Sequence, residues 1–587
     1  MKLDFSFSKW ADGFLGVVRG FPVTTVLTLF GVVCGLLVVG NPHNEMAVRV
    51  LLTAVLFFPV SIALQQMEKQ SYPGWVKIGS HVLGLLLLVV HFLFFSRFDE
   101  FVRDDFTQYI LWFGLAVVFL TISPFLRKSL RGSVDYWEYN KQVVYAILFA
   151  FAYSALVFIG LAVALGATNA LFSLNWDGEV WLRLWILCVG LLSVPIFLSK
   201  LPDVSEVQQA EEFPKELRLL AGGVLLSLVC VYFVILYAYT FKILALNEWP
   251  KGVLASLIVG FSTIGLVTFV LLYPLSKLES RYRRIFIILF VSFIPQIIVL
   301  FYAVTLRLKD YGLTENRYLL ISFGIWLGLV SLYFLFSKSK SLKVIPFSLI
   351  VFLLLASTGP VSAFRLSERD QVNRLKTLLI SKHILVNNVL VKGPHSLSIE
   401  ETGSIYSGLQ YLNSYHGLDS ISDFLPNDIR ASNTHPCKRD ERGCADLEQI
   451  TTYIGVEYVP GGLESHYVSF NVLRDTPRVL DIKGFDRLVE DLGEVKVGSD
   501  TYTFTIDKSG YEYKVLKNNF VISNVALKDL IDKLQKSDYQ KIQKGFTQEE
   551  MSITYSDGSI DMKIYFDYIT LIDGRLEVKD LKLIKIK

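Results

Sequence analysis

The stretch VIPFSLIVFLLLASTGPVSAFRLSERDQVNRL, residues 344–375, contains the boundary that decides the architecture of this chain. Up to Phe364 it is almost wholly apolar, and from Arg365 onward charged residues interrupt it every few positions. Upstream, apolar stretches of about 20 residues recur from Phe21 and are separated by short charged loops; each is long enough to cross a hydrocarbon core of roughly 30 Å. The sequence therefore predicts a membrane domain over residues 21–364 and a soluble domain over residues 365–587.

The apolar stretches predict a polytopic α-helical membrane domain with about eleven transmembrane helices. The spans are expected near residues 21–40, 47–66, 75–96, 107–127, 142–168, 180–199, 219–243, 252–275, 285–306, 318–337 and 344–364. Residues 1–20 lack the residue order of a cleavable signal peptide. They are interpreted as a helix on the inner membrane surface or as a plain cytoplasmic leader.

Lysine and arginine are distributed unevenly among the loops between the spans. With the N-terminus inside, the inner loops hold 19 of these residues and the outer loops hold 8. Cationic loops stay in the cytoplasm during membrane insertion. The bias predicts a multi-pass membrane protein with a cytoplasmic N-terminus, and an odd number of spans then places residues 365–587 outside the cytoplasm.

Two of the five cysteines form the motif Cys437-Lys-Arg-Asp-Glu-Arg-Gly-Cys444 in the soluble domain. In an oxidising compartment a disulfide would close this short polar loop, which agrees with the predicted placement. A metal site is the alternative, but only His435 lies nearby and a structural zinc normally takes four ligands. We therefore expect a disulfide, and no metal or other cofactor.

The soluble domain is expected to have an α+β fold. Ser367-Glu-Arg-Asp370 is typical of a helix N-cap with an acidic third residue, and a second amphipathic helix is expected after Ser398. Between them, Ile384–Val391 is strand-like. Alternating apolar positions beyond the cysteine loop predict antiparallel strands. Turns are expected at Ser509-Gly510, Asp557-Gly558 and Asp573-Gly574.

Residues 479–492 and 521–534 resemble each other weakly. Each segment is interpreted as a strand, a short helix and a hairpin, which would make the pair an internal repeat. Chance similarity between amphipathic helices is the alternative.

Part of the chain resembles a bacterial membrane family known as domain of unknown function 4153. Three stretches carry the resemblance: Tyr237-Ala-Tyr239 with Trp249-Pro-Lys-Gly252; Tyr311-Gly-Leu-Thr-Glu-Asn-Arg-Tyr318; and Gly359-Pro360 with Ser367-Glu-Arg-Asp-Gln371 and Arg374-Leu375. It covers roughly residues 220–430, and its octapeptide is fairly specific. The resemblance implies a location in the bacterial inner membrane and carries no activity with it.

All three stretches fall on the predicted outer face, where they define a candidate ligand-binding site. Its residues are Trp249, Lys251, Tyr311, Glu315, Arg317, Tyr318, Glu368 and Arg369. Aromatic rings at the interface and arginine forks suit an anionic lipid headgroup. The alternative is structural: the rings form an ordinary interfacial belt, and Arg317 pairs with Glu315 or Asp310 to brace the soluble domain.

Several functional classes are disfavoured by the sequence. The net charge of +3 and the lack of basic runs interleaved with aromatic residues argue against nucleic acid as a partner. No motif of a soluble enzyme is found, and no Asp or Glu lies at the centre of a span, which argues against proton-coupled transport.

The function expected first is that of a non-enzymatic anchor, sensor or scaffold that presents an extracytoplasmic module to another envelope component. A membrane-embedded enzyme or carrier that acts on an anionic lipid or a lipid-linked sugar is the second hypothesis. A transporter is the third.

Overall fold

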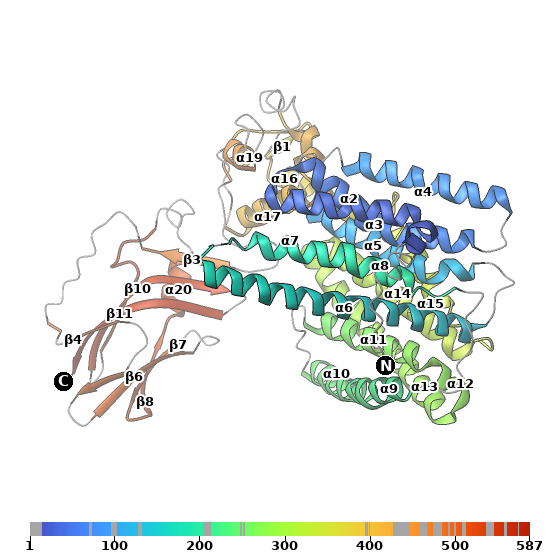
Figure 1. Ribbon diagram of the computed structural model, residues 1–587. Coiled ribbons are helices and arrows are strands. Elements are labelled where there is room, and N and C mark those ends of the chain that lie inside the picture. Colours follow the sequence, from blue (N-terminus) through green and yellow to red (C-terminus); the bar gives the residue numbers. More distant parts are fainter. Residues whose placement is uncertain are drawn as a thin grey trace. The chain divides into compact units, whose positions relative to one another are not determined.

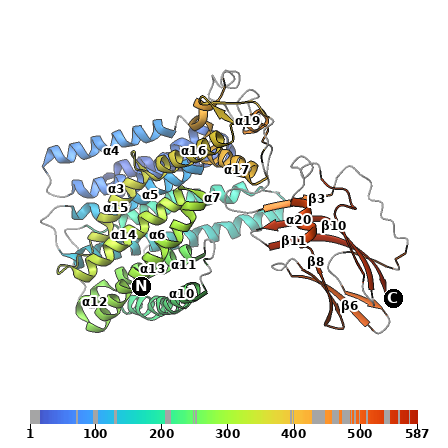
Figure 2. The same cartoon turned by 180° about the vertical axis from the view of Figure 1, so that it is seen from behind.

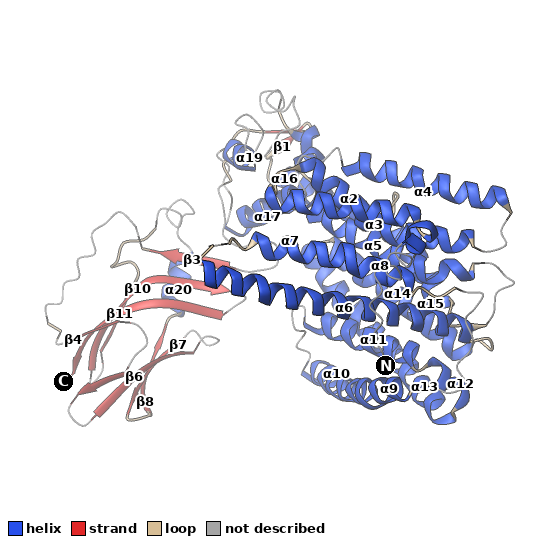
Figure 3. Ribbon diagram, in the orientation of Figure 1, coloured by secondary structure: helices blue, strands red, loops and turns tan. Residues whose placement is uncertain are grey.

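A computed structural model represents the chain (Figure 1). It describes residues 15–69, 73–95, 103–126, 132–174, 176–203, 213–246, 249, 253–393, 397, 399–426, 447–456, 467–472, 484–485, 487–490, 494–497, 500–507, 512–535, 545–556, 560–572 and 575–586. The chain divides into two compact units, Met1–Ser367 and Glu368–Lys587. Every described strand lies in the second unit (Figure 3).

Long helices that run alongside one another build the first unit (Figure 2). They are α2 (Pro22–Gly40), α3 (Glu45–Glu68), α4 (Gly74–Phe95), α5 (Arg103–Ile122), α6 (Ser133–Phe172), α7 (Glu179–Cys188), α8 (Val194–Ser199), α9 (Lys215–Leu217), α10 (Leu226–Leu246), α11 (Val253–Leu271), α12 (Tyr273–Leu278), α13 (Ser280–Tyr311), α14 (Glu315–Phe336) and α15 (Val344–Ser357). The π-helical turns η2 (Val189–Ser193) and η3 (Arg218–Leu225) join α7 to α8 and α9 to α10.

Within the described ranges, ten helices are long and apolar enough to cross a membrane. Their large apolar side chains are widely exposed; Leu85 on α4 is 64% exposed and Leu156 on α6 is 69% exposed. Such surfaces require lipid rather than water as their solvent. The protein is therefore a multi-pass membrane protein. The eleventh expected span corresponds to α15, which has only 14 residues.

A proline explains the widened helical turn between α7 and α8. Pro195 has no backbone N–H, and its ring crowds the carbonyl four residues earlier. The π-helical turn η2 directly precedes it, and Val194 N bonds Val189 O across five residues. The extra residue in this turn lets one continuous helix pass the proline.

Three cationic loops of the first unit meet at one end of it. At the start of α6, Ser133 Oγ lies 3.1 Å from Ser341 Oγ in the α14–α15 loop. In the same loop, the carbonyl of Lys340 accepts a 2.7 Å hydrogen bond from Tyr273 OH of α12. These contacts bring together three loops that the sequence assigned to one side of the membrane.

The first described part of the second unit is helical. The helix α16 (Ala363–Ser381) crosses the boundary between the units and is followed by α17 (Ile399–Tyr415), the 3-10 segment η4 (Leu418–Phe424) and α19 (Leu447–Ile454). They share a core that includes Leu379, Ile405 and Ile450. The helices expected from the sequence on either side of Ile384 are thus present.

The expectation of one strand-like segment at Ile384–Val391 needs correction. The chain forms a small hairpin there, β1 (Leu385–Val386) paired with β2 (Val389–Leu390). Asn387 and Asn388 form its turn, with φ of 48° and 63°. Two residues with positive φ make the turn type that best fits a two-residue hairpin.

Two antiparallel sheets make up the described remainder of the second unit. One has the order β3 (Tyr467–Asn471), β10 (Ile560–Ile572), β11 (Arg575–Ile586) and β4 (Arg487–Glu490), with β9 (Ser552–Ser556) also paired to β10. The other is a meander of β5 (Glu494–Val497), β6 (Asp500–Asp507), β7 (Glu512–Lys517) and β8 (Phe520–Ala526). Both sheets and the helix α20 (Lys528–Gln535) contribute to one core that contains Phe504, Leu530 and Phe566. The expected turns at Ser509, Asp557 and Asp573 lie outside the described residues.

Over the residues that the structure describes, the two segments do not share the fold expected of an internal repeat. Residues 521–534 form strand β8 and then helix α20, as expected. In the other segment, the expected helix at residues 485–492 is contradicted by strand β4, in which Leu488 pairs with Leu583 of β11. Pairing with a distant strand overrides the local helical pattern at this position.

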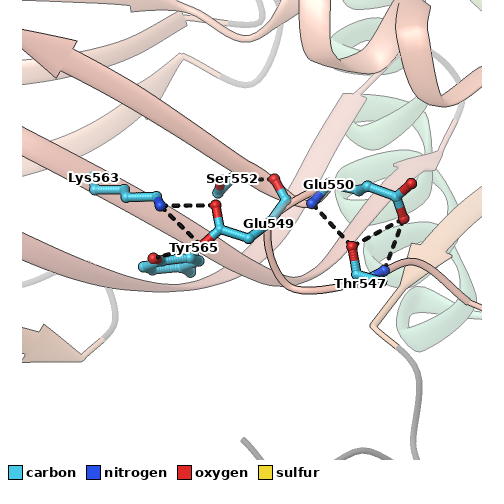
Figure 4. A network of polar contacts seen from close by, with 6 residues as sticks. All are labelled: Thr547, Glu549, Glu550, Ser552, Lys563 and Tyr565. Atoms are coloured by element: carbon cyan, nitrogen blue, oxygen red, sulfur yellow. Dashed lines mark hydrogen bonds and ion pairs between the residues drawn. The ribbon is translucent and has the colours of Figure 1, made fainter. Parts of the chain in front are cut away.

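A compact turn at residues 547–551 covers strand β10 (Figure 4). The Glu550 carboxylate accepts from Thr547 N at 3.0 Å, as in a capping box. Lys563 Nζ of β10 donates to both oxygens of Glu549, at 2.9 and 2.8 Å. This ammonium holds the pKa of the Glu549 carboxyl below its usual range, and the carboxylate raises the pKa of Lys563. The turn inserts the buried Met551 into the core.

The contact between α2 and the π-helical turn η2 gives a prediction about packing. A Cβ on Gly190 would lie 2.1 Å from Val32 Cγ2, and valine is stiff in a helix. We expect Gly190→Ala to destabilise the protein by about 1–3 kcal/mol. Thermal unfolding in detergent measures this. Gly160→Ala on α6 is the control, since no heavy atom lies within 4 Å of its added Cβ. Equal melting temperatures for both variants would contradict the packing.

Candidate functional site

The octapeptide at residues 311–318 forms the turn between α13 and α14. Gly312 has φ of 72° and ψ of −172°, a backbone conformation that is essentially restricted to glycine. Its N–H bonds Leu308 O at 3.0 Å and so ends α13. Three residues later, Glu315 begins α14. The glycine therefore allows two long helices to reverse direction within three residues.

Arg317 closes this turn from within the protein. It is only 4% exposed, and Nη1 donates to the Gly312 carbonyl at 2.9 Å. The guanidinium carbon lies 5.5 Å from the centre of the Tyr311 ring, a cation–π contact. The planar fork is thus engaged with the backbone and an aromatic ring of its own turn. This burial was not expected from the sequence, since arginine between two apolar spans is normally exposed.

Glu315 is buried as well, at 3% exposure, and binds the start of α16. Its carboxylate accepts a hydrogen bond from the hydroxyl of Ser367, which is fully buried and also lies 2.7 Å from Ala363 O. The first turn of α14 adds favourable electrostatics, because a helix N-terminus stabilises negative charge. This hydrogen bond joins residues 52 positions apart in the chain.

A second hydrogen bond reinforces the same junction. Tyr318 OH donates to Val361 O at 2.6 Å. Val361 and Ser367 both belong to the segment that follows α15, so this segment is attached twice to the first turn of α14. Two of the three stretches that carry the family resemblance therefore lie together. We refer to Tyr311, Glu315, Arg317, Tyr318 and Ser367 as the exit cluster.

Of the remaining expected site residues, Trp249, Glu368 and Arg369 are described by the structure. Trp249 is half-buried and packs on Tyr302 of α13, with ring centres 4.5 Å apart. In the second unit, Glu368 is half-buried and Arg369 is exposed on α16. Lys251, Cys437 and Cys444 lie outside the described residues. The structure thus brings together four of the eight expected ligand-binding residues, and binding of a ligand by these residues stays a prediction.

The role of Ser367 differs from the one expected from the sequence. It was expected to cap a helix, but α16 already begins at Ala363, and the hydroxyl of Ser362 accepts from Arg365 N at 3.4 Å. Ser362 is therefore the capping residue. This frees Ser367, one turn further along, to bond Glu315.

Other polar side chains within the spans also have partners. Thr24 Oγ1 lies 2.8 Å from Ser61 Oγ and donates to Gln65 at 3.1 Å. His91 Nδ1 lies 3.2 Å from Thr53 Oγ1, among aromatic rings of α3 and α5. Such pairs connect neighbouring helices where water is absent. In the part of the chain that the structure describes, no group of three His, Cys, Asp or Glu side chains could hold a metal ion.

Fold and site define a class of protein: a polytopic membrane protein in which the segment after α15 is hydrogen-bonded to the first turn of α14 and is followed by a C-terminal α+β region. The chain belongs to the family described as "Domain of unknown function (DUF4153)", whose model matches residues 46–385. That match includes the exit cluster.

One curated relative is an uncharacterized protein of Pasteurella multocida (strain Pm70). It is 26% identical over 239 residues, which cover 40% of this chain and 40% of the relative. The chain thus matches well under half of that protein's length. No solved structure matches the chain.

The Glu315–Ser367 contact gives a prediction for a double-mutant cycle. Because a buried hydrogen bond to a charged group contributes about 1.5–3 kcal/mol, the effects of Glu315→Ala and Ser367→Ala on stability should be non-additive by roughly that amount. Thermal or denaturant unfolding of the purified protein measures the coupling. The exposed neighbour Asn316 supplies the control, and Asn316→Ala combined with Ser367→Ala should be additive. Additive effects of the Glu315 and Ser367 variants would show that the contact is unimportant.

Proposed function

We propose that the protein is a non-enzymatic membrane anchor of the bacterial envelope. Its membrane domain holds an outward-facing C-terminal α+β module that binds or senses another envelope component. The observation that carries this proposal is the burial of Glu315 and Arg317 in the exit cluster. A scaffold needs a firm connection between its membrane part and the segment that leads to its module.

The exit cluster has the properties of such a connection. The carboxylate of Glu315 and the guanidinium of Arg317 are the groups best suited to grip a headgroup, yet both bond to other parts of the chain. The bond from Arg317 to the Gly312 carbonyl holds the α13–α14 turn against α14. The bond between Ser367 and Glu315 holds the segment after α15 against the same helix. Removing one partner of such a buried group is strongly destabilising. This arrangement favours bracing over recognition of a ligand.

A membrane-embedded enzyme or carrier for an anionic lipid is the second candidate. Trp249 and Tyr318 support it, because both rings are only half-buried and belong to the family stretches. In that case Arg317 would have to exchange its contact with Gly312 for one with the headgroup.

Contacts of α14 support the proposal that α15 crosses the membrane as an eleventh span. The two ends of the chain would then lie on opposite sides of the membrane. Near the end of α14, Tyr333 OH accepts a 2.8 Å hydrogen bond from Ser341 N. Near its start, Tyr318 OH donates to Val361 O. The stretch of α14 between these tyrosines is about 22 Å long, and the 14 residues of α15 span about 21 Å. The chain between these contacts thus returns along α14. A helix shorter than the hydrocarbon core is accommodated by local thinning of the bilayer.

The contacts between the cationic loops support a cytoplasmic location for that end of the first unit. Loops at Ser133, Tyr273 and Ser341 contact one another at one end of the unit, and all are rich in Lys and Arg. Positive loops are retained in the cytoplasm. The exit cluster, at the other end of α14, then faces outward.

Reporter fusions on either side of α15 test this topology. A reporter that works only in the cytoplasm should be active after Lys343 and silent after Ser362 and after Lys587.

In intact cells, thiol labelling without reduction should leave Cys437 and Cys444 unmodified because of their disulfide. Cytoplasmic activity after Ser362 would contradict the eleventh crossing, and free thiols at both cysteines would contradict the oxidising location.

The variant Arg317→Lys separates the two candidate functions. Lysine keeps the charge but loses the planar fork. For an anchor, complementation of a deletion strain should fall only as far as the amount of folded protein falls, and raised expression should restore it. The control Arg307→Lys, in the last turns of α13, should leave both quantities unchanged. Loss of complementation at normal abundance would contradict the anchor and favour a headgroup site.

A further inference from the structure

A cavity of about 240 Å³ lies at the end of the first unit where the cationic loops meet. It is lined by the end of α11, by α12, by the first turns of α13, by the last turn of α14 and by Lys340 in the following loop. It is separate from the exit cluster, because none of the cluster residues lines it. It therefore has no part in the function proposed above.

Aromatic rings form the inner wall of the cavity. Phe269 of α11 contacts Phe286, Phe290 and Phe334, with ring centres 5.1, 4.9 and 4.8 Å away. Phe290 and Phe334 are stacked at 5.1 Å. All four rings are buried. Because the rings are fixed by one another, the wall is a rigid apolar surface.

Cationic side chains form the rim. Lys277 and Arg283 are exposed, and Lys340 is half-buried. Lys277 Nζ lies 5.4 Å from the ring centre of Tyr273, which also lines the cavity. The nearby acid Glu279 pairs with Arg218 at 3.1 Å, so it does not cancel the charge of the three rim residues.

The backbone holds Lys340 in an unusual conformation beside the cavity. Its φ is 42°, in the left-handed region that residues with a side chain rarely adopt. The hydrogen bond from Tyr273 OH to its carbonyl fixes it there. Strained residues of this kind are concentrated at ligand-binding sites. Arg283 lies in the first turn of α13, where the helix dipole also attracts negative charge.

We propose that this cavity binds the phosphate group of an anionic phospholipid. The three cations are suited to the phosphate, and the aromatic wall is suited to the adjoining apolar part of the lipid. The cavity is smaller than the roughly 300–1,000 Å³ of typical small-molecule pockets, so it accepts a headgroup region rather than a whole lipid. Ile287, which also lines the cavity, is 39% exposed and continues the apolar surface of α13.

Native mass spectrometry of the full-length protein in detergent tests the proposal. The probes are dioctanoyl-phosphatidylglycerol, dioctanoyl-phosphatidylcholine and inorganic phosphate. The protein should retain phosphatidylglycerol at least about tenfold more strongly than phosphatidylcholine, as expected for charge-assisted contacts. Inorganic phosphate should not displace it at millimolar concentration. If inorganic phosphate displaced the lipid, the cavity would be a site for free phosphate and not for a phospholipid. Equal retention of both lipids would contradict a site for an anionic headgroup.

Two matched pairs of variants locate the site. Arg283→Gln with Lys340→Gln should weaken retention of phosphatidylglycerol about tenfold, whereas Arg284→Gln with Lys338→Gln should not, since neither control residue lines the cavity. Equal losses in both pairs would mean non-specific attraction and would overturn the proposal.

The second pair changes shape without changing charge. Ile287→Trp should obstruct the opening and weaken retention, whereas Ile288→Trp, at the more exposed neighbouring position, should have no effect. Unchanged thermal unfolding shows that each variant is folded. A folded Ile287→Trp protein with full retention would overturn binding inside the cavity.

Discussion

Hydrocarbon offers no hydrogen-bond partner, so a polar group among the membrane helices is costly unless the protein itself supplies one. Pairs such as Thr24 with Ser61, and His91 with Thr53, meet this requirement between helices. The contact between Glu315 and Ser367 meets it at the point where the chain leaves the membrane unit. That contact positions the start of α16, and with it the first residues that lead to the second unit.

The membrane helices could be predicted well because their signal is local. The length of an apolar run shows by itself whether the run can cross the bilayer. Packing against neighbouring helices changes only where the helix begins and ends. The helix α6 extends from Ser133 to Phe172 although residues 142–168 were expected, because polar residues such as Asp135 and Glu138 can continue a helix beyond the hydrocarbon. The second unit was harder to predict. There, Leu488 entered a strand through pairing with Leu583, a partner that no local pattern reveals.

Four of the eight residues expected at the candidate site belong to the exit cluster, and their arrangement could not be predicted from the sequence. The sequence indicated Glu315 and Arg317 as important, and the structure places both in one cluster. Their burial depends on Ser367 and Gly312, and only the return of the chain along α14 brings Ser367 close. The cavity beside Lys340 was missed for a similar reason: its cations were interpreted only as a topological signal, while its aromatic wall is assembled from three separate helices.

The length of α6 has a consequence for the surrounding bilayer. Large apolar residues are exposed along it from Val144 to Phe172, a distance of about 43 Å, which exceeds a typical hydrocarbon core by about 13 Å. This hydrophobic mismatch is relieved when the helix tilts or the bilayer thickens around it. Because α7 and α8 pack along α6, they take part in the same adjustment. Lipids beside α6 therefore face a taller apolar surface than a typical hydrocarbon core provides.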